Sequence, residues 1–220
     1  MQHPSPATDD LLWRETVSQC VSGAGIMDEE VETTLLKSFL ALPRTQFVEG
    51  VSPEHALIDV DIPAGFDQWL TRPSLQVRML ALIQLKKRMR VLELGFGSGY
   101  LCAVMEHAGA HVFGVEQIGL LAQRTRKNLD ALGHHGVVVR RGEGAKGWSD
   151  SGPYDAIVIS YPVVNESEIP FDQLRRGGIA VGVLVPEGSA DTAPAIGQLC
   201  LWTRGLGSVR RVTFEEATLR

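Results

Sequence analysis

Three glycines in the middle of the chain have the spacing of a loop that could hold a small ligand. The segment VLELGFGSGY (residues 91–100) places Gly95, Gly97 and Gly99 directly after an apolar run and before a helical pattern. Glycines in such a turn let backbone N–H groups approach a ligand at the start of a helix. We therefore expect this loop to cradle a ligand.

Acidic residues near the ends of three successive apolar runs narrow the choice of ligand. Glu93 precedes the glycine loop, Glu116 ends the following run, and Glu143 lies in the segment RRGEG after the next one. A carboxylate at the place of Glu116 can accept hydrogen bonds from both hydroxyls of a ribose, and Glu143 could reach an adenine amino group. A nucleoside without phosphates fits this set better than a dinucleotide does. S-adenosylmethionine is such a ligand.

Two other interpretations of the loop stay open. A nicotinamide-binding fingerprint reads G-x-G-x-x-G, but Tyr100 stands at its last position and the third glycine comes one place early, so an NAD-dependent dehydrogenase is the weaker alternative. A glycine turn after a strand can also be only a tight connection with solvated acids beside it. The occurrence of all these features in order favours ligand binding.

Short apolar runs alternate with helical patterns from residue 90 onward. This alternation predicts βαβ units and a parallel sheet covered on both faces. The last stretch, residues 197–219, has two strand-like runs joined by a glycine-rich turn and predicts an antiparallel hairpin at the sheet edge. The expected strands are Arg90–Leu94, His111–Val115, Gly136–Val139, Tyr154–Ser160 and Ile179–Val185, and the expected helices are Gly99–His107, Ile118–Leu132 and a short one at Phe171–Arg176.

The first 89 residues have a helical character of their own. From Asp28, a good N-cap, apolar residues recur at helical spacing until Pro43 ends the pattern. Pro73 then opens a second amphipathic segment, PSLQVRMLALIQL. We expect these helices to form an extension before the sheet.

Composition and charge disfavour several classes of protein. The formal net charge is −5 and the basic pairs are scattered over different elements, which argues against nucleic-acid binding. The longest apolar stretch, residues 179–185, is too short to span a membrane, and the N-terminus lacks the pattern of a secretory signal. Three separated cysteines and no Cys/His ligand spacing predict neither disulfides nor a metal site. A reducing cytoplasm is the expected location.

Several blocks of the sequence resemble the protein-L-isoaspartate O-methyltransferase family. The glycine-loop block is shared by many methyltransferases, whereas LPRTQFV (42–48) and RRGEGAKGW (140–148) are more particular to this family. The likeness spans most of the chain from residue 40 onward. Its other blocks are DIPAGFDQWLTRP (61–73), VFGVEQ (112–117), GPYDAIVIS (152–160) and LRRGGIAVGV (174–183).

The resemblance implies an α/β, Rossmann-like class I methyltransferase fold: a mostly parallel seven-stranded sheet with an antiparallel edge hairpin and an N-terminal helical extension. The N-terminal residues predict a disordered tail (1–10), and the resemblance implies the extension with the acceptor loop (11–89) and a core that binds S-adenosylmethionine (90–220). The product would be S-adenosylhomocysteine, the substrates isoaspartyl-containing peptides or damaged proteins awaiting repair, and the usual form a monomer. The residues implied to bind the cofactor are Glu93, Gly95, Gly97, Ser98, Gly99, Glu116, Gln117, Gly142, Glu143 and Gly144.

The acceptor loop departs from the family pattern. Family members commonly read G-Q-T-I-S-Q-P, with a serine thought to touch the acceptor carboxylate, where this chain reads D-Q-W-L-T-R-P (67–73). Thr71 and Arg72 are the predicted catalytic residues, because a hydroxyl can donate to a carboxylate and a guanidinium can pair with it. The alternative role for Thr71 is to cap the helix that starts at Pro73.

These departures leave the acceptor open. Trp69 is either a lid over the acceptor or a core anchor, and Tyr161 and Pro162 stand where the family has small residues. Methylation of isoaspartyl carboxylates is the first expectation. Another protein or small-molecule acceptor, or a non-catalytic protein that binds S-adenosylmethionine, are the alternatives. A carboxylate acceptor is ionised at neutral pH and needs no general base, which agrees with the lack of an obvious catalytic dyad.

Overall fold

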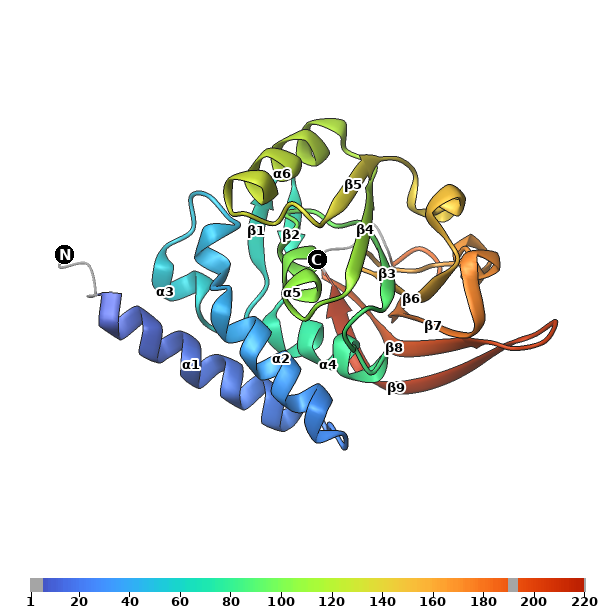
Figure 1. Cartoon of the computed structure of the whole chain (residues 1–220), viewed down its shortest axis with the longest axis horizontal. Coiled ribbons are helices and arrows are strands. Elements are labelled where there is room, and N and C mark those ends of the chain that lie inside the picture. The colour runs from blue at the N-terminus through green and yellow to red at the C-terminus, as the bar shows by residue number, and fades with distance from the viewer. Residues whose placement is uncertain (1–5, 190–193, 220) are drawn as a thin grey trace.

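Seven strands form one sheet in the order β5-β4-β3-β6-β7-β8-β9 (Figure 1). The computed structural model describes residues 6–189 and 194–219. Strands β5, β4, β3, β6 and β7 run parallel, and β8 and β9 pair antiparallel at one edge, so the predicted sheet and hairpin are confirmed. The strands are β3 (Arg90–Leu94), β4 (His111–Glu116), β5 (Val138–Arg141), β6 (Tyr154–Ile159), β7 (Leu174–Leu184), β8 (Ala195–Arg204) and β9 (Val209–Leu219).

Side chains of the central strands alternate between two apolar layers. Val91, Val158 and Val181 join a buried cluster with residues of the helices, whereas their neighbours Leu92 and Ile157 belong to a second cluster on the other face. The second layer is closed by the irregular segments before and after β6, residues 142–153 and 160–173, whose helical parts are short 3-10 turns. The central strands β3 and β6 are therefore buried on both faces, as their near-continuous apolar sequences predicted, whereas the edge strands β5 and β9 are largely exposed.

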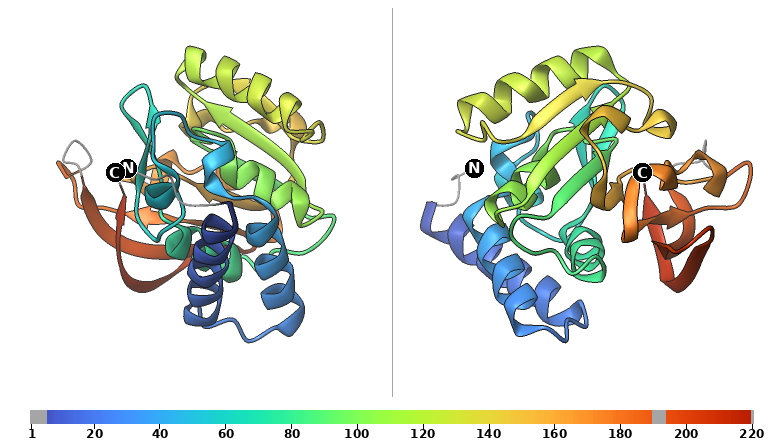
Figure 2. Two further views of the ribbon diagram at one scale, coloured as in Figure 1. Left: turned by 90° about the vertical axis from the view of Figure 1, so that its left-hand side faces the viewer. Right: turned by 45° about the vertical axis from the view of Figure 1, so that its right-hand side comes forward.

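The helices before and between the strands cover the first layer (Figure 2). Asp28 caps α2 by accepting from the backbone N–H groups of Glu30 and Val31, and Pro73 occupies the first turn of α4, as expected. A small two-stranded hairpin, β1 with β2, precedes α4 and was not predicted. The elements are α1 (Pro6–Gly23), α2 (Glu29–Ala41), α3 (Pro53–Ala56), β1 (Ile62–Gly65), β2 (Gln68–Leu70), α4 (Pro73–Leu82), α5 (Tyr100–His107) and α6 (Gly119–Ala131).

The N-terminal tail expected over residues 1–10 is shorter than predicted. Helix α1 begins at Pro6, so the expectation is wrong for residues 6–10, while residues 1–5 lie outside the described part of the chain. Tertiary contacts stabilise this helix: Trp13 is buried and its indole Nε1 donates to the carbonyl of Phe39 in α2 at 2.9 Å. Local periodicity in the sequence cannot reveal such a contact, because the two residues are 26 positions apart.

The short helix expected at Phe171–Arg176 is also wrong. Only a 3-10 turn forms at Phe171–Gln173, and β7 already begins at Leu174, which pairs with Tyr154 before a register shift. Strand pairing with β6 is available at this position and overrides the weak helical pattern.

The division expected between residues 89 and 90 stays a prediction. One cluster of buried side chains runs from Val17 in α1 to Leu219 in β9, so the extension shares its core with the sheet. Within the described residues, no helix is long and apolar enough to cross a membrane.

Candidate functional site

The glycine loop lies at the carboxyl end of β3, where the order of strands reverses. The chain passes from β3 outward to β4 and β5 and then returns to β6 on the other side of β3. Ligands of open α/β sheets bind in the crevice above such a switch point. We call residues 95–99 at this crevice the cradle.

Each glycine of the cradle has a left-handed backbone. The φ angles of Gly95, Gly97 and Gly99 are +77°, +51° and +80°, a region that other L-residues rarely adopt. A Cβ at Gly97 would meet no atom closer than 4.0 Å, so the space above that residue is open to a ligand. A Cβ at Gly99 would lie 2.6 Å from Thr125 Cγ2, so that glycine serves the packing of the loop on α6.

Glu116 ends β4 with its carboxylate against the cradle. One oxygen accepts from the Gly97 backbone N–H at 3.2 Å and the other from the Ile118 N–H at 2.9 Å. A carboxylate offers about four acceptor positions, so two remain for hydroxyl donors of a ligand. This geometry agrees with the predicted ribose contact, which stays a prediction.

Glu93 lies below the cradle and is almost fully buried. Its carboxylate accepts from Ser160 Oγ at 2.8 Å and from the Cys102 thiol at 2.9 Å, which ties β3 to the end of β6 and to α5. Burial raises the pKa of Glu93 from 4.5 to about 7, although both hydrogen bonds favour the ionised form. The same carboxylate and burial keep the pKa of the Cys102 thiol well above its usual value.

The loop after β5 supplies the next predicted group. Glu143 is exposed and pairs with Lys146 Nζ at 2.9 Å, and Gly144 follows it at the crevice. The backbone N–H of Gly142 donates to the Glu116 carbonyl at 2.9 Å, which fixes this loop beside β4. Gln117 is exposed on the same rim.

A cleft of about 630 Å³ joins these strand ends to the β1–β2 hairpin. This volume is within the range of sites for small ligands. The described residues that line the cleft carry several carboxylates and no lysine or arginine, which favours a cationic or neutral ligand over a phosphate. The lining residues are Asp67, Gln68, Trp69, Gly95, Gly97, Val115, Glu116, Gln117, Glu143, Gly144, Ala145, Ser160, Tyr161, Pro162, Glu168, Ala195 and Leu219.

The side of the cleft opposite the cradle is formed by residues 62–71, which we call the hairpin wall. Its tip is strained, because Phe66 and Asp67 have φ angles of +56° and +57° without being glycine. Arg124 on α6 holds this tip by lying over the Phe66 ring, 5.1 Å from its centroid, and by donating to the carbonyl of Ala64. The wall is thereby fixed across the crevice to α6.

A buried arginine anchors the base of the hairpin wall. Arg44, from the LPRTQFV block, is 0% exposed and donates to the carbonyls of Ile58, Val60 and Leu70 at 2.9–3.2 Å and of Thr71 at 3.5 Å. Burial lowers the pKa of this guanidinium to about 10, so it stays charged at neutral pH. The LPRTQFV block, which is particular to the family that the sequence resembles, therefore positions the acceptor loop.

Thr71 lies on the cleft side of the hairpin wall. It lines a small cavity together with Glu93, Ser98 and Ser160, directly beside the cradle. The alternative role as helix cap does not occur, because the cap position of α4 is Arg72 and no side chain bonds there as a cap. Contact between Thr71 and an acceptor stays a prediction.

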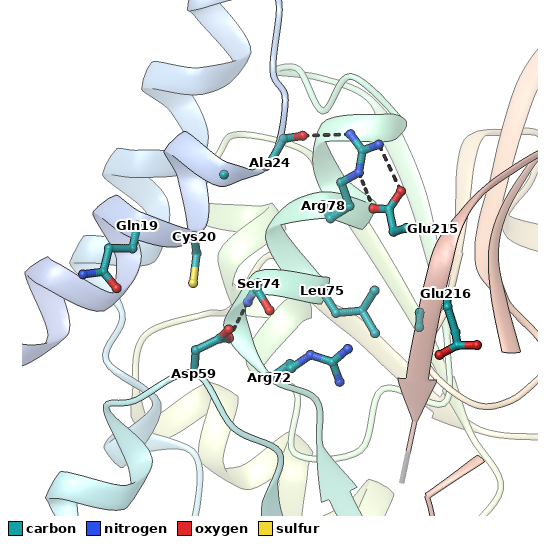
Figure 3. A pocket seen from close by; sticks show the side chains of 12 residues that line it. Gln19, Cys20, Ala24, Asp59, Arg72, Ser74, Leu75, Arg78, Glu215 and Glu216 are labelled. Carbon is teal, nitrogen blue, oxygen red and sulfur yellow. Dashed lines mark hydrogen bonds and ion pairs between the residues drawn. The ribbon is translucent and has the colours of Figure 1, made fainter. Parts of the chain in front are cut away.

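Arg72 points to the opposite side. Its Nη1 donates to Thr218 Oγ1 at 2.8 Å and to the Thr218 carbonyl at 3.0 Å, and lies 3.8 Å from Asp61. It lines a separate pocket of about 320 Å³ between α1, α4 and β9 (Figure 3). The structure therefore does not bring Arg72 to the cleft, because its guanidinium is already bound to β9.

Of the predicted residues, Glu93, Gly95, Gly97, Ser98, Glu116, Gln117, Glu143, Gly144 and Thr71 gather around the cleft and the adjacent cavity. Gly99 and Gly142 do not line either space: Gly99 packs against Thr125 of α6, and Gly142 bonds to the Glu116 carbonyl. Sequence reasoning missed Ala195 and Leu219, where the paired ends of β8 and β9 meet the cleft. No local motif marks these two residues, since only strand pairing brings them there. Among the described residues, no group of three or more His, Cys, Asp or Glu could hold a metal ion.

Comparison with known proteins finds relatives in one family. The model of the family described as protein-L-isoaspartate(D-aspartate) O-methyltransferase (PCMT) matches residues 21–193. The chain is 37% identical over 157 residues to the protein-L-isoaspartate O-methyltransferase of Yersinia enterocolitica, covering 71% of this chain and 74% of the relative. It is 36% identical over 169 residues to protein-L-isoaspartate O-methyltransferase 2 of Geotalea uraniireducens, covering 77% and 76%.

Solved structures share the fold. A protein-L-isoaspartate O-methyltransferase structure superposes with a TM-score of 0.79 at 25% identity, covering 93% of this chain, which spans 64% of that one. The Plasmodium falciparum beta-aspartate methyltransferase (PCMT), in complex with S-adenosyl-L-homocysteine, gives a TM-score of 0.72 at 18% identity over 95% of each chain.

Proposed function

Because the chain belongs to the protein-L-isoaspartate O-methyltransferase family, we propose that it transfers a methyl group from S-adenosylmethionine to the carboxylate of L-isoaspartyl residues in damaged proteins. One observation carries this proposal: a glycine cradle that is open above Gly97 and has a strand-end carboxylate borders a cleft of fitting volume and a small cavity lined by Thr71. The product would be a methyl ester on the way to protein repair.

The residues of the cleft suit the cofactor. The open space above Gly97 accommodates its close approach, and the spare acceptor positions of Glu116 suit the ribose hydroxyls. We assign Glu143 and Gln117, which line the cleft, to the adenine, and Glu93, Gly95 and Ser98, which line the adjacent cavity, to the methionine half. The acidic lining also suits a cation. When bound, the cofactor supplies an electrophilic methyl group on a sulfonium.

Positioning is the main contribution of the chain to catalysis. The acceptor carboxylate is ionised at neutral pH and needs no base, and aligned reactants can gain roughly 7–11 kcal/mol from orientation alone. We assign to Thr71 the hydrogen bond that orients the acceptor carboxylate. Arg44 keeps Thr71 in place through the backbone carbonyls that it binds. Trp69, half-buried beside the cleft, would limit access of water.

A different acceptor is the second candidate function. The observation that favours it is the orientation of Arg72, which leaves no guanidinium or ammonium among the described residues that line the cleft. An acceptor without a carboxylate, or cofactor binding without turnover, would agree with this lining.

We further propose that the chain works as a monomer in the cytoplasm and without nucleic acid. The three buried, unpaired cysteines support a reducing compartment, and the net charge of −5 argues against nucleic-acid binding. Gel filtration of the purified chain checks the monomer.

The deciding experiment measures S-adenosylhomocysteine release with an L-isoaspartyl peptide and with its L-aspartyl twin. Release with the isoaspartyl peptide alone is expected, and Glu116→Gln should abolish most of it. Release with neither peptide, while S-adenosylhomocysteine still binds, would contradict the acceptor and favour the second candidate.

A further inference from the structure

The ring of Tyr161 lies inside the cleft, across the cradle. Tyr161 follows β6, and a Cβ built on Gly95 would lie 2.8 Å from its Cδ1 atom. A Cβ built on Gly144 would lie 2.4 Å from its hydroxyl oxygen. The ring therefore extends from the end of β3 to the loop after β5 and touches both glycines.

These two glycines are positions where the cofactor is expected to approach the backbone. A glycine in a nucleoside site leaves room for a ligand, and in this chain a side chain fills that room. At Gly144 the filling accounts for the residue type, since φ there is not positive and any Cβ would collide with the Tyr161 hydroxyl. Ring and cofactor thus compete for the same surface.

The backbone on both sides of Tyr161 is anchored, whereas the ring is only half-buried. The Ser160 N–H donates to the Leu94 carbonyl at 2.9 Å and the Val163 N–H to the Val183 carbonyl at 2.8 Å. Burial and the charge of Glu168 raise the pKa of Tyr161 to about 12, so no charge holds the hydroxyl in place at neutral pH. Because the flanking backbone is held, rotation about the side-chain bonds of Tyr161 is the movement that would clear the cradle.

We propose that Tyr161 determines the affinity of the cofactor site by occupying the cradle at Gly95 and the surface of Gly144 in the loop after β5, from which its ring must rotate before S-adenosylmethionine or S-adenosylhomocysteine can bind. This inference rests on the proposed function, since it takes the same ligand. It assigns Tyr161 a role that the small residues common in the family at this position could not have.

Competition of this kind has a kinetic signature. The ligand binds only the fraction of molecules with the ring rotated out, so the observed association rate constant is the intrinsic rate constant multiplied by that fraction. Once the ligand is bound the ring is already out, and the dissociation rate constant is unchanged. A ring that served as a wall of the bound state would instead slow dissociation.

Rapid-mixing kinetics with S-adenosylhomocysteine on wild type, Tyr161→Ala and Tyr161→Phe test the proposal. If one molecule in about ten has the ring out, Tyr161→Ala should bind about tenfold faster with dissociation within twofold of wild type. Tyr161→Phe keeps the ring and should behave as wild type. Denaturant melts of all three variants check that folding is retained.

The opposite pattern would overturn the proposal. Faster dissociation of S-adenosylhomocysteine from Tyr161→Ala, with unchanged association, would make the ring a wall of the site. Binding by Tyr161→Ala alone would support a closed cradle in the wild type. Absence of binding to every variant would overturn the cofactor assignment itself, and the gating role with it.

Gly144→Ala offers a second test from the partner side. Its Cβ should push the Tyr161 ring off the cradle, so association should change less on adding Tyr161→Ala to this variant than to the wild type. Equal changes in both backgrounds would contradict a contact between the two residues.

Discussion

The two sides of the cleft are held in different ways. The cradle is positioned by its own strand and by glycines with positive φ angles, with Glu93 and Glu116 bonded beneath and beside it. The hairpin wall has non-glycine residues at positive φ and is held by arginines from distant segments, Arg44 at its base and Arg124 at its tip. One side is specified locally and the other by tertiary contacts.

This difference suggests why one side matches the family and the other varies. A backbone that must approach a common cofactor needs glycines at fixed places. A wall that faces a variable acceptor can change residues such as Trp69 and Thr71 while its buried anchor stays the same. The predictions below test this division of roles.

Removal of the anchor should have the largest effect. Arg44→Ala leaves buried carbonyls of the hairpin wall without their donor, so we expect a loss of about 3–5 kcal/mol in the free energy of unfolding. Denaturant titration measures it. Arg14→Ala, at an exposed i,i+4 pair, is the control and should change stability by less than about 0.5 kcal/mol. Similar losses of stability in Arg44→Ala and Arg14→Ala would contradict the idea that Arg44 holds the hairpin wall.

Adding a side chain to the cradle should lower the free energy of unfolding somewhat less than removal of Arg44 does. Gly99→Ala combines an unfavourable φ with a Cβ 2.6 Å from Thr125 Cγ2, and we expect a loss of about 3 kcal/mol. Gly133→Ala is the matched control, because its φ is +85° and a Cβ there meets no atom within 4 Å. It should cost only about 1–2 kcal/mol. Equal losses would mean that packing on α6 is unimportant.

The buried acid below the cradle should make stability depend on pH. The pKa of Glu93 is raised from 4.5 to about 7, so between these values the folded chain keeps a proton that the unfolded chain has lost. Stability should therefore fall as pH rises through this window, by up to about 1.4 kcal/mol per pH unit. Glu93→Gln should remove that slope, and Glu143→Gln, which is exposed, should retain it. A slope that persists in Glu93→Gln would point to other groups.

The strand-end carboxylate should matter for the cofactor and not for the acceptor. Glu116→Gln removes charge-assisted acceptors while keeping the shape, so S-adenosylhomocysteine binding should weaken by about 1.5–3 kcal/mol in calorimetry. The same titration on Thr71→Val serves as control from the other side of the cleft. An unchanged dissociation constant for Glu116→Gln would refute the ribose assignment.

The smallest expected effect separates Thr71 at the end of the hairpin wall from its neighbour Arg72. Thr71→Val should lower kcat/KM for an isoaspartyl peptide by about 1 kcal/mol with unchanged S-adenosylhomocysteine affinity, because one hydrogen bond to the acceptor is lost. Arg72→Met should instead lower the melting temperature, since the bonds to Thr218 and Asp61 disappear. Loss of turnover in Arg72→Met with unchanged stability would instead support the sequence-based prediction that Arg72 pairs with the acceptor carboxylate.

Local signals account for what could be read from the sequence. The strands around Glu93 and Glu116 and the turn at Gly95 follow from apolar runs and glycine spacing, which need no distant contact. The direction of Arg72 could not be read, because it depends on where β9 places Thr218. Nor could helix α1, which the bond from Trp13 to the carbonyl of Phe39 holds against α2. The turn of the β1–β2 hairpin could not be predicted, because Phe66 and Asp67 are not typical residues for a turn with positive φ angles.

The junction of Ala195 and Leu219 in the lining of the cleft has a practical consequence. These residues pair across β8 and β9, so a peptide inserted directly after Leu219 would start beside the opening. A flexible linker carrying an isoaspartyl sequence from that point would present a tethered acceptor at a high effective concentration. Such a single-chain fusion would convert a weak encounter between two molecules into an intramolecular one.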